Sequence, residues 1–230
     1  RKVNIRVCVP VAAKSSSELP SMIEKAESEG ADLIEVRLDY LKSIGGLEEI
    51  VGCASVPLIA TNRQYEQGGH RMQDEEDRIH NLVEAAERGF QYADIELRTR
   101  NLTDVISRLR NLDVKPIVSF HELTCTPNRP EMKRIVEGEM KAGAEICKVV
   151  TTANGIEDNV SCLLLLSEMR KVAKIVCFAM GERGLISRAL SPLFGGYFTY
   201  ASIGKGVKTA PGQIAISELK HLYGTLGVDV

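Results

Sequence analysis

A lysine stands in the middle of an apolar segment, in the stretch AEICKVVTTA at residues 144–153. The flanking side chains predict a buried strand, and no acidic residue adjoins Lys148. Burying an ammonium is costly unless it is paired or loses its proton. If Lys148 faces inward, burial and nearby arginines would depress its pKa. A neutral amine is a nucleophile toward carbonyl carbons and forms a Schiff base.

Other ionisable residues stand near the ends of further apolar segments. Glu35 and Arg37 are two residues apart and therefore share one face of a strand. Arg63 follows another such segment, and His121 ends a third, where it could act as a general acid or base beside Lys148. Each residue alone could be structural: an internal Glu35–Arg37 salt bridge, a structural histidine, or a lysine that reaches water on the helix side. Their coincidence at strand ends favours a catalytic site.

These residues belong to a regular series of short apolar segments separated by helical patterns. The predicted strands are residues 5–11, 32–38, 57–62, 92–97, 116–121, 145–150, 174–180 and 197–202. Several of the intervening helical patterns end at a glycine just before the next strand, as in MKAGAEICK. Eight such repeats predict an α/β fold, a (β/α)8 TIM barrel, as a single domain over residues 1–230. A doubly wound open sheet is the alternative, but no GxGxxG motif follows the first strand.

The last two predicted loops carry the features of an anion site. Thr209 can cap a helix, and the proline two residues later suits a first helical turn in the segment that ends at Gln213. The amino end of such a helix attracts negative charge, and Arg188 adds a cation nearby. We therefore expect a substrate that carries a carboxylate or a phosphate.

The composition restricts the classes of partner and the compartment. The 29 basic and 31 acidic residues give a net charge of −2, which gives no reason to expect nucleic acid or an anionic membrane as a partner. No apolar segment is long enough to span a bilayer, and the amino-terminal residues do not resemble a signal peptide. The six cysteines have neither CxxC nor zinc-like spacing, and the histidines are scattered, so we expect no metal site. We expect the cysteines to be buried free thiols and the protein to be cytoplasmic.

With these residues assembled, the sequence resembles the type I 3-dehydroquinate dehydratases, which act in the shikimate pathway. The resemblance covers essentially the whole chain. The matching pieces, in the family's order, are IEVRLD, TNR followed by GG, SFH, KVV, MGERGLISR and TAPGQ. Each piece alone is a weak signal, but six pieces in order at predicted strand ends are specific.

The resemblance implies roles for individual residues. The family's Schiff-base lysine falls on Lys148 and its acid/base histidine on His121. The residues that would hold the hydroxyls and carboxylate of a polyhydroxy keto acid are Glu35, Arg37, Arg63, Arg188, Thr209 and Gln213. The implied reaction is a syn dehydration of 3-dehydroquinate to 3-dehydroshikimate without metal or organic cofactor. The resemblance also implies a homodimer.

Two positions depart from the family's pattern. Many members have an acid directly before the Gly-Gly pair, where this chain has Gln67, with Glu66 one position earlier. The family often has Ser where this chain has Thr209, a change that keeps the hydroxyl. Two other functions stay open at this point: a class I aldolase acting on a phosphorylated sugar, and a catalytically silent barrel that binds a small acid or a partner.

Overall fold

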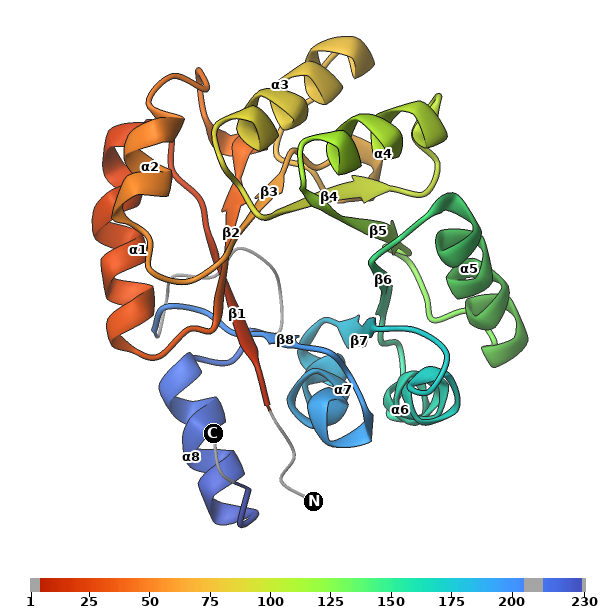
Figure 1. The fold of residues 1–230 in the computed structure, drawn as a ribbon. Helices are drawn as coiled ribbons and strands as arrows, with labels where there is room; N and C mark the ends of the chain where they lie inside the picture. Colours follow the sequence, from red (N-terminus) through yellow and green to blue (C-terminus); the bar gives the residue numbers. More distant parts are fainter. Residues whose placement is uncertain (1–4, 205–212, 229–230) are drawn as a thin grey trace.

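The computed structural model describes residues 5–204 and 213–228, which form eight parallel strands surrounded by helices (Figure 1). The strands are β1 (Val7–Val11), β2 (Leu33–Arg37), β3 (Leu58–Thr61), β4 (Tyr92–Glu96), β5 (Lys115–His121), β6 (Ile146–Thr152), β7 (Ile175–Met180) and β8 (Thr199–Tyr200). Each strand overlaps its predicted segment. The prediction of a (β/α)8 barrel is confirmed.

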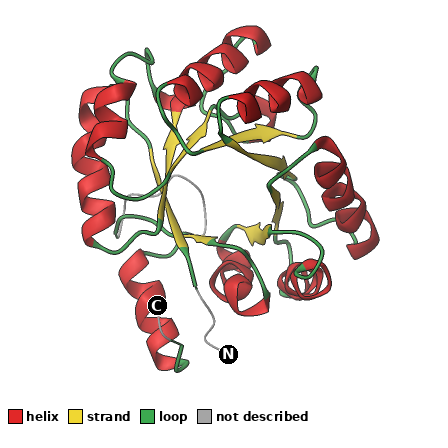
Figure 2. Ribbon diagram, in the orientation of Figure 1, coloured by secondary structure: helices red, strands yellow, loops and turns green. Residues whose placement is uncertain are grey.

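The α-helices form a ring outside the strands (Figure 2). They are α1 (Leu19–Ser28), α2 (Leu47–Cys53), α3 (Glu75–Glu87), α4 (Leu102–Asn111), α5 (Arg129–Ala142), α6 (Glu157–Met169), α7 (Leu185–Leu190) and α8 (Ile216–Thr225). Short 3-10 helices stand in the connections: η1 (Ser16–Glu18), η2 (Leu38–Tyr40), η3 (Tyr65–Gln67), η4 (Glu182–Gly184) and η5 (Ser191–Phe194).

Local sequence signals fix the ends of the helix that leads into β6. The Asn128 side chain accepts a hydrogen bond of 3.0 Å from the backbone N–H of Glu131, which caps the start of α5. Gly143 ends α5 with a φ of 100°, a left-handed conformation that glycine adopts without strain. Strand β6 begins after two further residues, so the end of α5 determines where the strand that carries Lys148 starts.

The hydrogen-bonded strand order is β7-β6-β5-β4-β3-β2-β1-β8. Between β7 and the segment before β8, the backbone N–H of Tyr197 donates to the carbonyl of Ile175 over 2.7 Å, which brings the two ends of the sheet together. The sheet is therefore nearly closed into a barrel.

Alternation along the strands separates an inner from an outer set of side chains. Ile146 and Val150 pack in the cluster that also contains Phe178 and Tyr200, whereas Cys147 and Val149 pack in a cluster that includes residues of α5 and α6. Because Lys148 lies between Cys147 and Val149, alternation places its side chain on the inner face with Ile146 and Val150.

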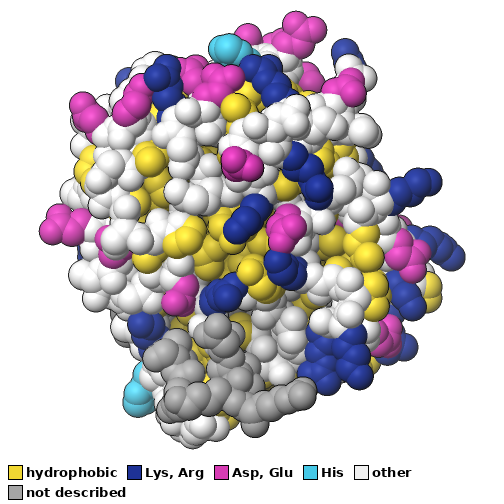
Figure 3. All heavy atoms as spheres, viewed as in Figure 1, with side chains coloured by type: hydrophobic (Ala, Val, Ile, Leu, Met, Phe, Trp, Pro, Cys, Tyr) yellow, Lys and Arg dark blue, Asp and Glu magenta, His cyan; other side chains and the backbone are white. Residues whose placement is uncertain are grey.

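The surface is of mixed charge. Acidic and basic side chains are interspersed around hydrophobic ones on the face seen along the barrel axis (Figure 3), in keeping with the small net charge. None of the helices in the described residues is long and apolar enough to cross a membrane. All six cysteines lie in the described part and are free thiols, four of them buried.

Candidate active site

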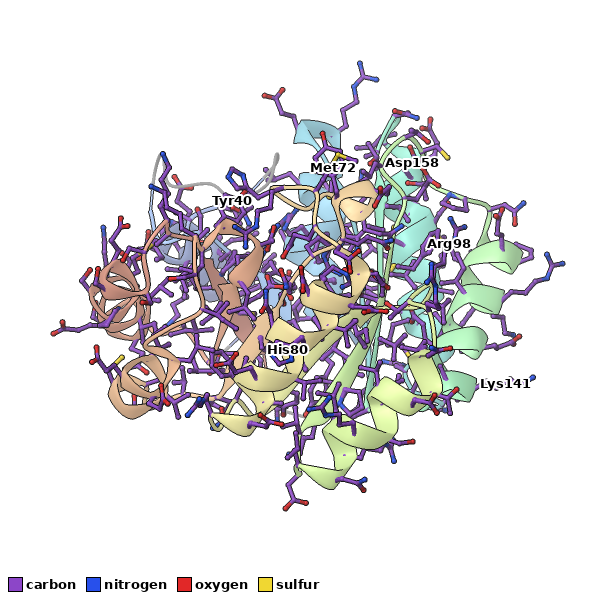
Figure 4. The ribbon with its side chains drawn as sticks, turned by 90° about the horizontal axis from the view of Figure 1, so that it is seen from above. Tyr40, Met72, His80, Arg98, Lys141 and Asp158 are labelled. Atoms are coloured by element: carbon purple, nitrogen blue, oxygen red, sulfur yellow. The ribbon has the colours of Figure 1, made fainter. Side chains whose placement is uncertain are left out.

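The inner polar residues surround a cavity of about 330 Å³ at the carboxyl ends of the strands. Of the eight site residues predicted from the sequence, seven line this cavity: Glu35, Arg37, Arg63, His121, Lys148, Arg188 and Gln213. Thr209 lies outside the described residues. The start of the helix expected in TAPGQ also lies outside the described residues; residues 213–215 are not helical, and α8 begins at Ile216. Figure 4 shows the barrel from the side, with Tyr40, Met72 and Asp158 toward one end and Lys141 away from it.

Lys148 lies in the interior of the barrel with its amine paired. The residue is 3% exposed, and Nζ donates hydrogen bonds to Asp94 Oδ2 over 2.8 Å and to the Tyr200 hydroxyl over 2.9 Å. Glu35 Oε1 lies 3.7 Å from the same nitrogen, and Nζ is 4.6 Å from the centre of the Tyr200 ring. The sequence led us to expect arginines near this lysine. The structure places two carboxylates, Asp94 and Glu35, next to its amine.

Arg63 is buried between two carboxylates at the centre of the barrel. Its Nη2 lies 2.8 Å from Asp94 Oδ2, and its Nη1 donates to Glu96 Oε1 over 2.8 Å. Burial acts to lower the pKa of Arg63, but Asp94 and Glu96 outweigh it and hold that pKa above its usual range. Likewise, burial would raise the pKa of Asp94, but Arg63 and Lys148 keep it well below its usual range. Arg63 and Asp94 therefore both stay charged at neutral pH.

Glu35 and Arg37 do not form the salt bridge that their spacing allowed. Arg37 instead makes a two-point contact with Asp39, from Nε to Oδ1 over 2.8 Å and from Nη2 to Oδ2 over 2.7 Å. Glu35 accepts a hydrogen bond of 2.7 Å from the hydroxyl of Thr61. This arrangement leaves the Glu35 carboxylate beside the Lys148 amine.

His121 stands at the rim of the same cavity. Its strand position pairs with Val150, two residues beyond Lys148 along the neighbouring strand. The pKa of His121 lies well below its usual 6.5. Burial is the largest cause, and the positive charges of Arg63 and Lys148 add to it. The imidazole is therefore neutral at physiological pH, and its Nδ1 is buried without a hydrogen-bond partner among the described residues. The backbone N–H of His121 donates to Gln67 Oε1 over 2.7 Å.

Arg188 is a buried cation that has no acidic partner in the part of the chain that the structure describes. It is 2% exposed, and its Nε and Nη2 are buried without hydrogen-bond acceptors. The guanidinium carbon lies 4.2 Å from the centre of the Phe178 ring. Burial lowers the pKa of Arg188 to about 10. A guanidinium in this state offers two N–H donors to an incoming anion.

Sequence reasoning missed two residues of this site, Asp94 and Tyr200. Asp94 precedes Glu96 by two positions in the segment YADIEL, so alternation puts the two carboxylates on the same face of the predicted strand. Tyr200 lies in an aromatic segment, YFTYAS, whose pattern predicts only a buried strand and indicates no polar role for its hydroxyl. No grouping of three or more His, Cys, Asp or Glu residues in the described ranges could hold a metal ion.

Comparisons with known proteins cover almost the whole chain. The family described as type I 3-dehydroquinase matches residues 7–230. A 3-dehydroquinate dehydratase of Dehalococcoides mccartyi is 39% identical over 207 residues, which span 90% of this chain and 91% of that protein. One from Methanothermobacter thermautotrophicus is 34% identical over 226 residues, 97% of this chain and 98% of that protein.

Solved structures agree with the fold. The 3-dehydroquinate dehydratase of Geobacillus kaustophilus superposes with a TM-score of 0.90 at 24% identity, over 97% of this chain and 91% of that one. The enzyme of Aquifex aeolicus gives a TM-score of 0.81 at 27% identity, over 96% of this chain and 98% of that one. The chain therefore belongs to the type I 3-dehydroquinase family of hydro-lyases.

Proposed function

We propose that the chain dehydrates 3-dehydroquinate to 3-dehydroshikimate through an imine on Lys148, with His121 as the group that moves protons. The observation that carries this proposal is the convergence of three features on one cavity. These are the buried amine of Lys148, the neutral imidazole of His121 and the unpaired guanidinium of Arg188.

Substrate binding follows from the charges around the cavity. The substrate carboxylate pairs with Arg188, because the buried N–H donors of that residue lack acceptors and an anion would satisfy them. Glu35 and Arg37 line the same cavity and bind ring hydroxyls, and Gln213 closes its edge. Thr209 adds a hydroxyl contact in this proposal, as the family resemblance implies. Together these contacts hold the ketone over Lys148.

Imine formation begins with loss of a proton from the Lys148 ammonium to His121. The neutral amine then adds to the C3 carbonyl, and water leaves with a proton from the imidazole to give a protonated imine. That imine carries a positive charge where the ammonium was, beside Asp94 and Glu35. Carboxylates already in place for a cation stabilise this intermediate without reorganisation.

The elimination uses the protonated imine as an electron sink. His121 removes a proton from C2 and the electron pair moves into the imine, which gives an enamine. The enamine then expels the C1 hydroxyl, which leaves as water with the proton from His121, on the same face of the ring. Hydrolysis of the imine consumes the water released when it formed and restores Lys148. The net change is the loss of one water molecule.

The proposal is tested by trapping the imine. Borohydride added during turnover should reduce it and attach the ligand permanently to the peptide that contains Lys148, and mass spectrometry should find the adduct. Lys148→Ala should give no adduct and no rise in ultraviolet absorbance from the conjugated product, whereas Lys174→Ala, at an exposed lysine, should behave as the unchanged protein. Turnover without any adduct on Lys148 would overturn the imine mechanism.

We also propose that the protein is cytoplasmic and forms a homodimer. The free thiols of all six cysteines suit a reducing compartment.

The outer face of α6 exposes Val160 and Leu164, four residues apart, and Ile156 precedes them by one turn. Apolar surface of this kind is buried in homodimer interfaces. Light scattering should give about twice the chain mass of 25.2 kDa, and Val160→Glu should reduce it to the monomer. A monomeric unchanged protein would contradict this proposal.

A further inference from the structure

A second cavity, of about 250 Å³, lies beside the active site on the other side of the β3–α3 connection. The short helix η3 separates the two. Tyr65 and Glu66 line the second cavity, whereas Gln67 and Gly68 line the catalytic one. We call the second space the arginine cavity, because its lining includes Arg71, Arg78, Arg98 and Arg100.

One of these arginines is already neutralised. Arg78 is buried and pairs with Glu75 through Nε over 2.9 Å and with Glu96 through Nη1 over 2.6 Å. Its Nη2 donates to the hydroxyl of Thr99 over 3.1 Å. Arg78 is therefore a structural link between α3 and β4 and contributes little free positive charge to the cavity.

The other three arginines make no ion pair and no hydrogen bond with any residue in the described ranges. The Nε of Arg71 is buried without an acceptor. The guanidinium carbon of Arg98 lies 5.1 Å from the centre of the Phe120 ring. Arg98 also helps to lower the pKa of Glu122, but that carboxylate takes its hydrogen bonds from Thr124.

The acidic side chains at the cavity do not balance this charge. Glu75 is engaged with Arg78, which leaves Glu66 as the one other acid in the lining. The lining therefore holds three arginines without an ion pair, two of them exposed, and a single unengaged carboxylate. Positive charge gathered in a concave space attracts anions more strongly than the same charge on a flat surface.

We propose that the arginine cavity is a second, non-catalytic site that binds a phosphate group, either as inorganic phosphate or as the phosphate of a small phosphate monoester. The planar fork of a guanidinium matches the oxygens of a phosphate, and a dianion compensates the excess charge better than a single carboxylate does. The buried N–H of Arg71 gains the acceptor that it lacks. A volume of about 250 Å³ suits a phosphate with a small organic substituent.

The site is tested by titrating the purified protein with inorganic phosphate in a calorimeter, with sodium chloride adjusted to hold the ionic strength constant. Saturable binding is expected at millimolar concentration or below, with one phosphate per chain in Arg188→Met, which lacks the free cation of the catalytic cavity. Arg71→Ala and Arg100→Ala should each weaken binding about tenfold, because each removes a charge-assisted hydrogen bond. Glu66→Gln should strengthen binding, because it removes the competing negative charge.

Two control variants distinguish the arginine cavity from the catalytic cavity and from nonspecific binding to surface cations. Arg188→Met removes the free cation of the catalytic cavity, which can itself take an anion, and should leave the phosphate affinity of the arginine cavity unchanged. Arg134→Ala removes an exposed cation of α5 and should do the same. A comparison of glycerol 3-phosphate with inorganic phosphate identifies the source: tighter binding of the monoester indicates a phosphorylated metabolite, and equal affinity indicates the free ion.

Several outcomes would overturn the proposal. They are no saturable binding, equal weakening by Arg71→Ala and Arg134→Ala, or a loss of binding confined to Arg188→Met. Thermal unfolding of each variant shows whether it is folded, and Arg100→Ala, at an exposed side chain, carries the test if Arg71→Ala does not fold. Since the readout is binding in the absence of substrate, its result does not depend on the proposed dehydratase mechanism.

Discussion

Asp94 and Lys148 form an ion pair in the interior of the barrel, with Oδ2 and Nζ 2.8 Å apart. The same carboxylate oxygen lies 2.8 Å from Nη2 of Arg63, and the Ser119 hydroxyl donates to the other oxygen over 2.6 Å. One buried anion therefore contacts two buried cations, each of which has a second carboxylate nearby, Glu35 for Lys148 and Glu96 for Arg63. An apolar strand tolerates Lys148 because of this acid, two strands away in the sheet.

Asp94→Asn should lower the free energy of unfolding by about 3 kcal/mol, because it leaves two buried cations with one compensating charge fewer. Chemical denaturation at neutral pH measures the change. Glu145→Gln is the matched control, since it removes one partner of the surface pair with Lys174 and should cost less than about 1 kcal/mol. Equal losses in the two variants would show that the central charges are not coupled as the distances indicate.

The pH dependence of turnover should reflect the depressed pKa of His121. Burial and the nearby cations keep the imidazole neutral below its usual pKa of 6.5, so the base needed for proton removal persists into mildly acidic solution. The fall of kcat/KM on the acidic side should therefore lie below pH 6.5 and not at it. His80→Gln, on an exposed side chain of α3, should leave the profile unchanged. A midpoint at or above 6.5 would contradict the proposed environment of His121.

The same shift has a consequence for stability. Between the depressed pKa and 6.5, the unfolded chain binds more protons at this position than the folded chain does. Stability must then fall as the pH is lowered through 6.5 and level off above it. His121→Phe should remove this contribution to the slope, which denaturation at a series of pH values would measure.

The barrel itself was predictable because each strand is a short apolar segment and several helices end at a clear signal, such as Gly143 before β6. The sequence left open whether Lys148 faces inward or reaches water on the helix side, and the structure places it inside, paired with Asp94. The partners of the charged residues were not predictable, because they depend on rotamers and on the stagger of strands. Arg37, for example, reaches Asp39 in its own connection and not Glu35 on its own strand face.

Arg188→Met should raise KM about 100-fold, since it removes two charge-assisted hydrogen bonds to the substrate carboxylate. The free energy of unfolding should stay the same or rise by about 1–2 kcal/mol, because an unpaired buried cation is replaced by an apolar side chain of similar length. Opposite changes in affinity and stability distinguish a binding residue from a structural one. A large loss of stability with unchanged KM would assign Arg188 a purely structural role.

Gln67→Glu should move the acidic limb of the pH profile upward. Gln67 Oε1 already accepts the backbone N–H of His121, and a carboxylate can keep this bond while it adds a negative charge that raises the pKa of the imidazole. Turnover at alkaline pH, where the imidazole is neutral in both proteins, should change little. A several-fold rise there would instead show that the acid found at this position in many family members has a direct role in catalysis.

Glu66→Gln is the matched variant, since it changes the same functional group one position earlier. Glu66 lines the arginine cavity and Gln67 lines the catalytic one, so removal of the Glu66 charge should leave kcat, KM and the pH profile as they are. Steady-state kinetics over a range of pH with both variants decides between the two positions. A loss of turnover in Glu66→Gln would mean that this carboxylate turns toward His121 during the reaction and supplies the acid that Gln67 lacks.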